Sequence, residues 1–348
     1  MAAALQSATV DVPADQDDFD AFARERGWSD GLPLIPPTAA RVEGYLQQWG
    51  VDPAEVVAEL PPSNAPVTAE KLAINAVMAG APASALPLLR AAVEAVADPR
   101  YELHALNATT GSVTTALIVN GEQRHSLGIP FGAGCLGGAD GRAAAIGRAL
   151  QLIMRNVAGQ RIGVTSQSTF GQPARTTGIV FGEWEERSPW APLAQRRGVG
   201  GDAVTAFGTM GTVNICETMA TDADTLLQFI GRSLAYHGAN GYLLQLSFAE
   251  VVVVLNPVWA PMIGAAYPDP ADVQNLLWES ASIPVTEWPV HYQQLYEQHG
   301  RINGQGRVLL ARRPEDVIVL FAGGLGGLHA AALHSWGTTM AQTRPVRA

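Results

Sequence analysis

Cysteine is scarce in this chain of 348 residues, which contains only Cys135 and Cys216. Two cysteines so far apart, with no Cys-x-x-Cys pair, exclude a disulfide framework, and the simplest interpretation of each is a buried reduced thiol. Basic residues are also few, 22 against 32 acidic ones, and Lys71 is the single lysine. The net charge of −10 argues against binding to nucleic acid, because such a surface needs clustered lysine and arginine.

Long apolar runs are missing as well. No uninterrupted stretch approaches the ~18 residues that a membrane-spanning helix needs, and residues 1–20 lack the basic start of a signal peptide. We therefore expect a cytoplasmic protein that does not contact a membrane. The seven histidines are scattered, and none lies four residues from another in a helical pattern, so we predict no metal site.

Nucleotide-binding signatures are equally weak. The sequence contains no P-loop and no nucleophile elbow. Gly132-x-Gly134-x-x-Gly137 has the letters of a dinucleotide motif, but no clear strand precedes it and no acidic residue follows about 20 positions later. We therefore expect no cofactor.

A substantial core is present, since 47% of the residues are hydrophobic. The run Val251-Val252-Val253-Val254-Leu255 is apolar on both faces, which is typical of a central strand covered by helices on each side. Helical and strand patterns alternate along the chain. These patterns predict an α/β fold, with mixed, largely helix-covered sheets in two related blocks and an N-terminal Pro-rich capping segment.

The domain organisation follows from changes in composition. Residues 1–17 are polar and predict a disordered tail. Residues 18–62 form a helical and proline-rich segment, residues 63–197 a first α/β block, and residues 198–348 a second one. Acidic residues precede the strands expected at 251–255 and 317–320, which indicates a weak internal repeat.

Two glycine-rich turns are the most informative motifs. The first, at residues 130–138, contains Gly134 and Cys135 and opens into a helix expected to begin near residue 140. The second, at residues 323–327, contains Gly326 and follows a strand; a short helix carrying His329 is expected after it. Backbone N–H groups at such helix starts favour either an anion site or an activated thiol with a lowered pKa.

Three further residues are candidates for catalysis. Lys71 leaves an almost wholly apolar helix, where its ammonium group either forms an ion pair with an acid such as Glu70 or holds a substrate anion. Asp30, in a proline-rich loop, is either a turn-forming residue or a catalytic carboxylate. His104 precedes a strand and is either structural or a general base.

Other candidates are expected to bind rather than to react. Arg148 lies on the polar side of the helix after the first turn, where it is placed to hold an anion, and Thr109 follows His104 closely enough to be a substrate contact. The loop with Trp184 and Trp190 is typical of a pocket wall or an oligomer contact, and we expect a homo-oligomer such as a dimer.

Several strings of residues together resemble a known family. They are Asp30-Gly31-Leu32-Pro33 with Pro36-Pro37-Thr38, Glu70-Lys71 with residues 75–80, Gly141-Arg142-Ala143 with residues 146–149, and Ser188-Pro189-Trp190. The chain resembles, over residues 27–340, large bacterial proteins associated with the UGSC (seleno)protein family. That resemblance implies kinship and no settled activity. The chain lacks a Cys-Gly-Ser-Cys motif, which argues against thiol redox chemistry. It is also similar to natural-product enzymes that close an aziridine ring by expelling sulfate, as in azinomycin assembly.

The glycine-rich turns, the arginines and the single lysine together predict a pocket for a small anionic substrate. We expect a cofactor-independent lyase or cyclase of natural-product biosynthesis, in which ring closure accompanies elimination of sulfate or a similar anion. Two alternatives remain open: a thiol-dependent enzyme that uses Cys135, and a non-catalytic protein that binds a small molecule.

Overall fold

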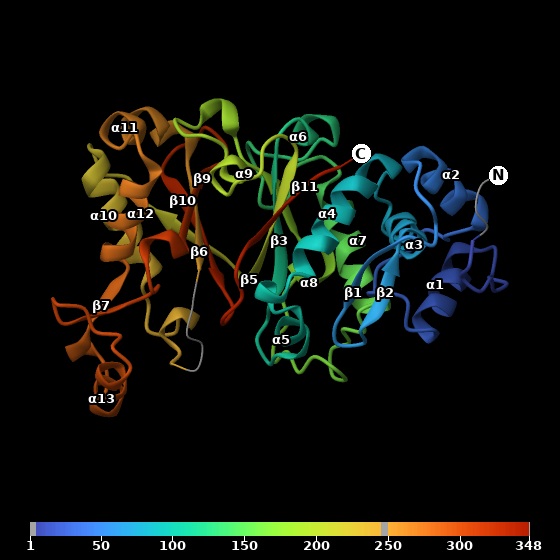
Figure 1. Cartoon of the computed structure of the whole chain (residues 1–348), viewed down its shortest axis with the longest axis horizontal. Helices are drawn as coiled ribbons and strands as arrows, with labels where there is room; N and C mark the ends of the chain where they lie inside the picture. Colours follow the sequence, from blue (N-terminus) through green and yellow to red (C-terminus); the bar gives the residue numbers. More distant parts are fainter. Residues whose placement is uncertain (1–4, 245–249, 348) are drawn as a thin grey trace.

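A mixed seven-stranded sheet forms the centre of the fold (Figure 1), in a computed structural model that describes residues 5–244 and 250–347. The strand order is β4-β3-β5-β10-β6-β9, with β11 also paired to β5. Two small two-stranded sheets, β1-β2 and β7-β8, complete the strands of the described chain. The strands are β1 Val56–Leu60, β2 Ala65–Thr68, β3 Thr114–Asn120, β4 Ile179–Gly182, β5 Ala203–Cys216, β6 Val251–Leu255, β7 Ser282–Pro284, β8 Arg307–Leu309, β9 Val317–Phe321, β10 His329–Ser335 and β11 Gln342–Pro345.

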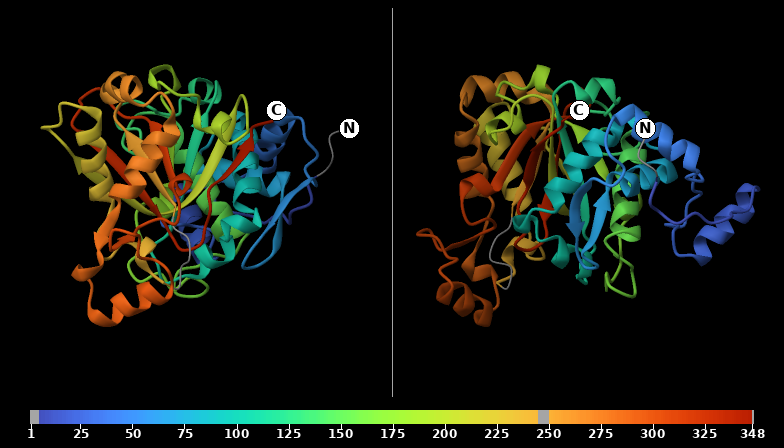
Figure 2. Two further views of the ribbon diagram at one scale, coloured as in Figure 1. Left: turned by 60° about the vertical axis from the view of Figure 1, so that its left-hand side comes forward. Right: turned by 45° about the vertical axis from the view of Figure 1, so that its right-hand side comes forward.

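Helices flank this sheet and extend the molecule at both ends. Figure 1 shows α10 and α12 beside β6 and β9, and α4 and α7 on the side of β3. The right-hand view of Figure 2 shows α1 and α13 at opposite ends of the molecule. The α-helices are α1 Gln16–Glu25, α2 Ala39–Trp49, α3 Ala69–Ala79, α4 Leu86–Val96, α5 Leu103–Ala108, α6 Gln123–Ser126, α7 Ala143–Asn156, α8 Ala174–Thr177, α9 Leu193–Arg196, α10 Ala223–Leu234, α11 Ala260–Ala266, α12 Pro270–Ser280 and α13 Val290–Gln298.

The α/β class predicted from the sequence is confirmed, and the sheet joins the two blocks. Strands β3 and β4 are parallel, as are β6 and β9, while β5 and β10 run antiparallel to each other between these two pairs. Strand β5 starts just after the boundary expected at residue 198 and pairs along its first half with β3. Both blocks therefore contribute to one sheet.

The strand β6 illustrates how the sheet is buried. Val251, Val253 and Leu255 pack in a cluster with residues of α10 and α12. Val252 and Val254 point to the other face and join a cluster that contains Cys135. Burial on both faces is confirmed. Long helices on both faces are not observed at this strand, because the first glycine-rich turn and the four-residue helix α9 cover the second face.

The helix α7 follows the first glycine-rich turn, as predicted, and starts at Ala143. Its residues Ile146, Leu150 and Ile153 are buried, in the expected helical period. Gly147 allows the helix to touch the segment before β4, since a Cβ atom at this position would lie 2.0 Å from the carbonyl oxygen of Thr177. This contact fixes the start of α7 beside the turn.

The structure differs from two expectations near the ends of the chain. The helix predicted over residues 328–336 is the strand β10, because pairing with both β5 and β6 overrides the helix propensity of its alanines. Residues 5–15, expected to be part of a disordered tail, have a defined path, and the backbone N–H groups of Gln6 and Ser7 donate to the carboxylate of Glu70. The apolar pattern of residues 243–248 also predicts a strand, and this segment falls mostly outside the described residues.

Within the described residues, every helix is too short or too polar to cross a membrane.

Candidate functional site

The two glycine-rich turns, which lie in different blocks of the sequence, meet in the folded protein. The backbone N–H of Gly323 donates to the carbonyl oxygen of Phe131 at 2.9 Å. Next to this bond, a Cβ atom added to Gly324 would lie 3.1 Å from the Cα and Cβ atoms of Ala133. Glycine at 324 therefore permits the close approach of the two backbones.

Two cavities open around these turns. The first, of about 320 Å³, is lined by both turns and by the side chains of Asn214, Asn256 and His329. The second, of about 400 Å³, is lined by the other side of the first turn and by the first residues of α7. Both cavities are lined by Gly134, Cys135 and Leu136. We call the two cavities together the turn cleft.

The turn cleft contains backbone N–H groups of the kind that anion-binding sites use. The first N–H groups of α7 have no intrahelical acceptor, and the N-cap residue Arg142 makes no side-chain capping bond to them. In the turns themselves, the N–H groups of Gly134 and Gly326 donate to no acceptor within the described residues. A helix of 14 residues also directs the positive end of its dipole towards the cleft.

Cys135 lies in the wall of the turn cleft but does not have the properties of a nucleophile. Its side chain is buried, and burial raises the pKa of the thiol to about 11. The activated-thiol alternative requires a lowered pKa, so this shift runs in the opposite direction. At neutral pH the side chain is a neutral thiol that packs beneath the turn.

His329 is the histidine in the lining of the first cavity. It is the first residue of β10 and is exposed, directly after the second turn. Because this turn leads into a strand and not into the predicted helix, a helix dipole is supplied only from the side of the first turn, by α7. An exposed imidazole beside backbone donors is placed to exchange a proton with a bound molecule.

The structure adds two asparagines that sequence reasoning missed. Asn256 follows β6 directly, and its amide nitrogen donates to the carbonyl oxygen of Gly324 at 3.0 Å, which holds the second turn in place. Its Oδ1 accepts the backbone N–H of Val258. Asn214 lies on β5 with an exposed side chain. A polar residue directly after an apolar strand was the available signal for Asn256, because such residues gather at the carboxyl edge of a parallel pair.

Asp30 and Arg148 form an ion pair outside the turn cleft. The guanidinium group of Arg148 donates to both carboxylate oxygens of Asp30, at 2.7 and 2.8 Å, and also to the carbonyl oxygens of Leu32 and Pro33. Both side chains are only about a tenth exposed. The pair attaches the proline-rich loop to α7, and neither residue lines the turn cleft; the catalytic role of Asp30 and the anion-binding role of Arg148 stay predictions.

The remaining candidates also lie away from the turn cleft. The ammonium group of Lys71 donates to the carbonyl oxygen of Pro66 at 2.8 Å, and its charge helps to lower the pKa of Glu70. His104 is exposed on α5. The hydroxyl oxygen of Thr109 accepts the backbone N–H of Gly111 at 3.0 Å. None of the three lines either cavity of the turn cleft in the described part of the chain.

Across residues 5–244 and 250–347, no three side chains of His, Cys, Asp or Glu gather in a way that would hold a metal ion.

When the chain is compared with known proteins, it matches no family model and no curated sequence. The resemblance to the UGSC family therefore stays a prediction.

Proposed function

We propose that the turn cleft binds a small anionic metabolite and that the protein is a cofactor-independent lyase or cyclase. The observation that carries this proposal is the meeting of the two glycine-rich turns around one cleft, with unpaired N–H groups, the start of α7 and His329 at its walls. Such groups stabilise an anion most when its charge grows, as happens when a bound sulfate or phosphate ester departs.

The reaction proposed is ring closure with loss of sulfate. The imidazole of His329 accepts a proton from the ammonium group of the substrate, and the nitrogen lone pair freed in this way attacks the neighbouring carbon that bears the sulfate ester. A C–N bond forms while the C–O bond breaks, and sulfate leaves with the bonding electron pair. The product is an aziridine, and the backbone donors of the turns receive the departing anion. No oxidation or reduction takes place, so the step needs no redox cofactor.

The alternative thiol-dependent reaction has less support. A thiol whose pKa lies near 11 provides very little thiolate at neutral pH. The lining of the first cavity contains His329 as a proton acceptor and no second cysteine, since Cys216 does not line either cavity of the described chain.

The proposal is tested with 2-aminoalkyl sulfate esters of increasing size. Released sulfate is measured by ion chromatography, and the ring-closed product by proton NMR. We expect sulfate release to be lost in His329→Gln, while Cys135→Ser and the distant variant His104→Gln retain it. Equal rates in the wild-type protein and in His329→Gln would contradict the proposed base. Absence of both sulfate release and binding of inorganic sulfate would contradict the proposed function.

A further inference from the structure

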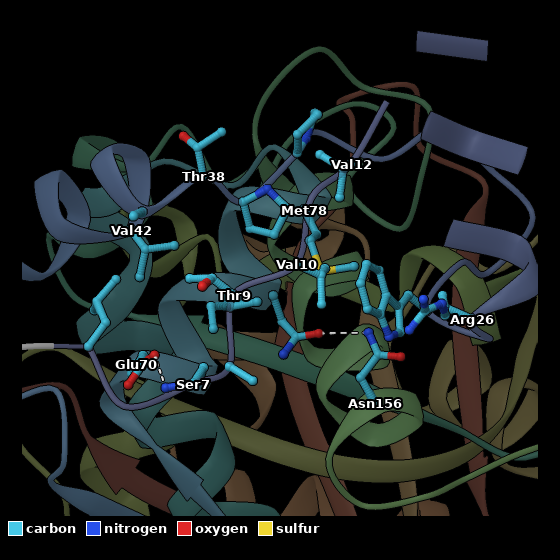
Figure 3. A pocket seen from close by; sticks show the side chains of 18 of the residues that line it. Ser7, Thr9, Val10, Val12, Arg26, Thr38, Val42, Glu70, Met78 and Asn156 are labelled. Carbon is cyan, nitrogen blue, oxygen red and sulfur yellow. Dashed lines mark hydrogen bonds between the residues drawn. The ribbon is translucent and has the colours of Figure 1, made fainter. Parts of the chain in front are cut away.

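A further cavity, separate from the turn cleft, lies at the other end of α7. Its volume is about 630 Å³. Figure 3 shows the segment with Thr9, Val10 and Val12 crossing this cavity, which Met78 and Asn156 also line. The turn cleft begins at the first residues of α7, whereas this cavity is lined by its last residue. Since α7 has 14 residues, the two sites are about 20 Å apart.

One wall of the cavity is the N-terminal segment, and a single carboxylate holds it. Glu70 is buried, and its two oxygens accept the backbone N–H groups of Gln6 at 2.8 Å and Ser7 at 2.9 Å. These bonds, with the charge of Lys71, lower the pKa of Glu70 against the opposing effect of burial. The only acidic side chain of the cavity lining is therefore already occupied by two donors.

The other charged groups of the lining are two arginines without a carboxylate partner. The guanidinium groups of Arg26 and Arg161 donate to no acceptor in the described chain. That of Arg26 lies 4.9 Å from the centre of the Phe22 ring. Although the chain is acidic overall, with a net charge of −10, two arginines without a carboxylate partner line this one cavity.

The remainder of the lining is apolar apart from a few groups that can form hydrogen bonds. It includes the side chains of Val10, Phe19, Trp28, Ile74 and Met78. The amide of Asn156 donates to Oδ1 of Asn75 at 2.9 Å, while its own Oδ1 is buried without a partner among the described residues. A buried acceptor of this kind is satisfied at little cost by a ligand donor or a water molecule.

We propose that this cavity is a binding site for an amphipathic organic acid, with an apolar body against Trp28 and Met78 and a carboxylate between Arg26 and Arg161. Two unpaired guanidinium groups select an anion, and the apolar walls select a hydrophobic body. The N-terminal segment is the cover of the site, and Glu70 holds it closed. This site is independent of the turn cleft and of the reaction proposed there.

The experiment uses the full-length protein and the fluorescent aryl sulfonate 1-anilinonaphthalene-8-sulfonate. We expect a saturable rise in its fluorescence that decanoate and 2-naphthoate reverse, whereas decanol and 2-naphthol do so at least tenfold less effectively. Whether decanoate or 2-naphthoate competes better distinguishes an aliphatic from an aromatic ligand. Equal competition by the acids and the neutral alcohols would overturn the proposed anion selectivity.

Variants locate the site. Arg26→Gln combined with Arg161→Gln should weaken binding of decanoate at least tenfold. Arg24→Gln is the matched control, because Arg24 lies in the last turn of α1, whose C-cap is Arg26, and does not line the cavity. Val10→Asp brings a negative charge to the cover at a position that is 45% exposed, so it tests the site without disturbing the core; Val10→Thr is its control. Wild-type affinity in both Val10→Asp and the double arginine variant would overturn the proposal.

Discussion

The backbone N–H of Gly323 donates to the carbonyl oxygen of Phe131, and this hydrogen bond joins the two glycine-rich turns at 2.9 Å. Phe131 follows the first parallel strand of the first block, whereas Gly323 follows the last parallel strand of the second block. The bond therefore joins two loops whose preceding strands, β3 and β9, lie on either side of the antiparallel strands β5 and β10. Its position brings both turns to the wall of one cavity.

The first prediction concerns two glycines of the second turn. Gly324 contacts the first turn, whereas Gly326 faces free space. Gly324→Val should lower the melting temperature, because even its Cβ atom would lie 3.1 Å from Ala133. A Cβ atom at Gly326 meets no other atom within 4 Å, so Gly326→Val should leave the melting temperature nearly unchanged. Because the valine side chain at position 326 would occupy the first cavity, we expect Gly326→Val to bind sulfate more weakly than the wild type. Calorimetric melting and sulfate titration measure the two effects; unchanged sulfate affinity in Gly326→Val would contradict an anion site at this turn.

The second prediction concerns the reactivity of the two thiols. Burial and a pKa near 11 should make Cys135 react with iodoacetamide much more slowly at pH 7.5 than the exposed Cys216. Peptide mass spectrometry after timed alkylation measures both rates in one sample. Faster alkylation of Cys135 than of Cys216 would support the thiol-dependent alternative instead.

The third prediction concerns the ion pair between Asp30 and Arg148. Arg148→Met should reduce the free energy of unfolding by about 3 kcal/mol, because it leaves the carboxylate of Asp30 nearly buried without its cation. Asp30→Asn retains an acceptor and should cost less. Urea unfolding measures both changes, and sulfate affinity should stay as in the wild type. If sulfate affinity fell while stability stayed unchanged, Arg148 would be shown to contribute to sulfate binding.

The fourth prediction is a pH dependence of stability that originates at Glu250. Burial raises the pKa of this carboxyl from its ordinary value of 4.5 to about 7, although Ala341 donates its N–H to the side chain and the charge of Arg197 opposes the shift. Below pH 4.5 the group is protonated in both the folded and the unfolded chain. Between pH 4.5 and 7 only the unfolded chain releases the proton, so this group makes the protein less stable by roughly 3 kcal/mol as pH rises.

The comparison with Glu250→Gln isolates this contribution from the other titrating groups. Glutamine does not ionise, so the stability of the variant relative to the wild type should increase between pH 4.5 and pH 7 and then remain constant. Urea unfolding at half-unit intervals of pH measures the difference. A difference that does not change with pH would show that the carboxyl has an ordinary pKa.

Local patterns were sufficient for much of the secondary structure. The period of Ile146, Leu150 and Ile153 predicted the buried face of α7, and the run at residues 251–255 predicted a strand buried on both faces. The same reasoning failed for residues 328–336, because alanine and leucine favour a helix locally. Hydrogen bonds to β5 and β6 decide that segment, and these come from strands that are distant in the sequence.

The candidate site was predictable only in part. The two turns predict Gly134, Cys135, Gly326 and His329 as site residues, and the fold brings all four to one cavity. Asp30 and Arg148 were chosen as separate functional groups, although they are partners of each other. Composition does not reveal such a pairing, because a carboxylate has the same character whether it faces a substrate or an arginine.

The sequence by itself determined the α/β class, the buried strands and the presence of two flexible turns, because these depend on residue periodicity and on the backbone freedom of glycine. Only the tertiary structure decided that the turns share a cleft, that Cys135 is buried with a raised pKa, and that the N-terminal segment covers a cavity beside Glu70. These features depend on contacts between residues far apart in the chain, and desolvation and pairing in the folded state set the chemistry of each group.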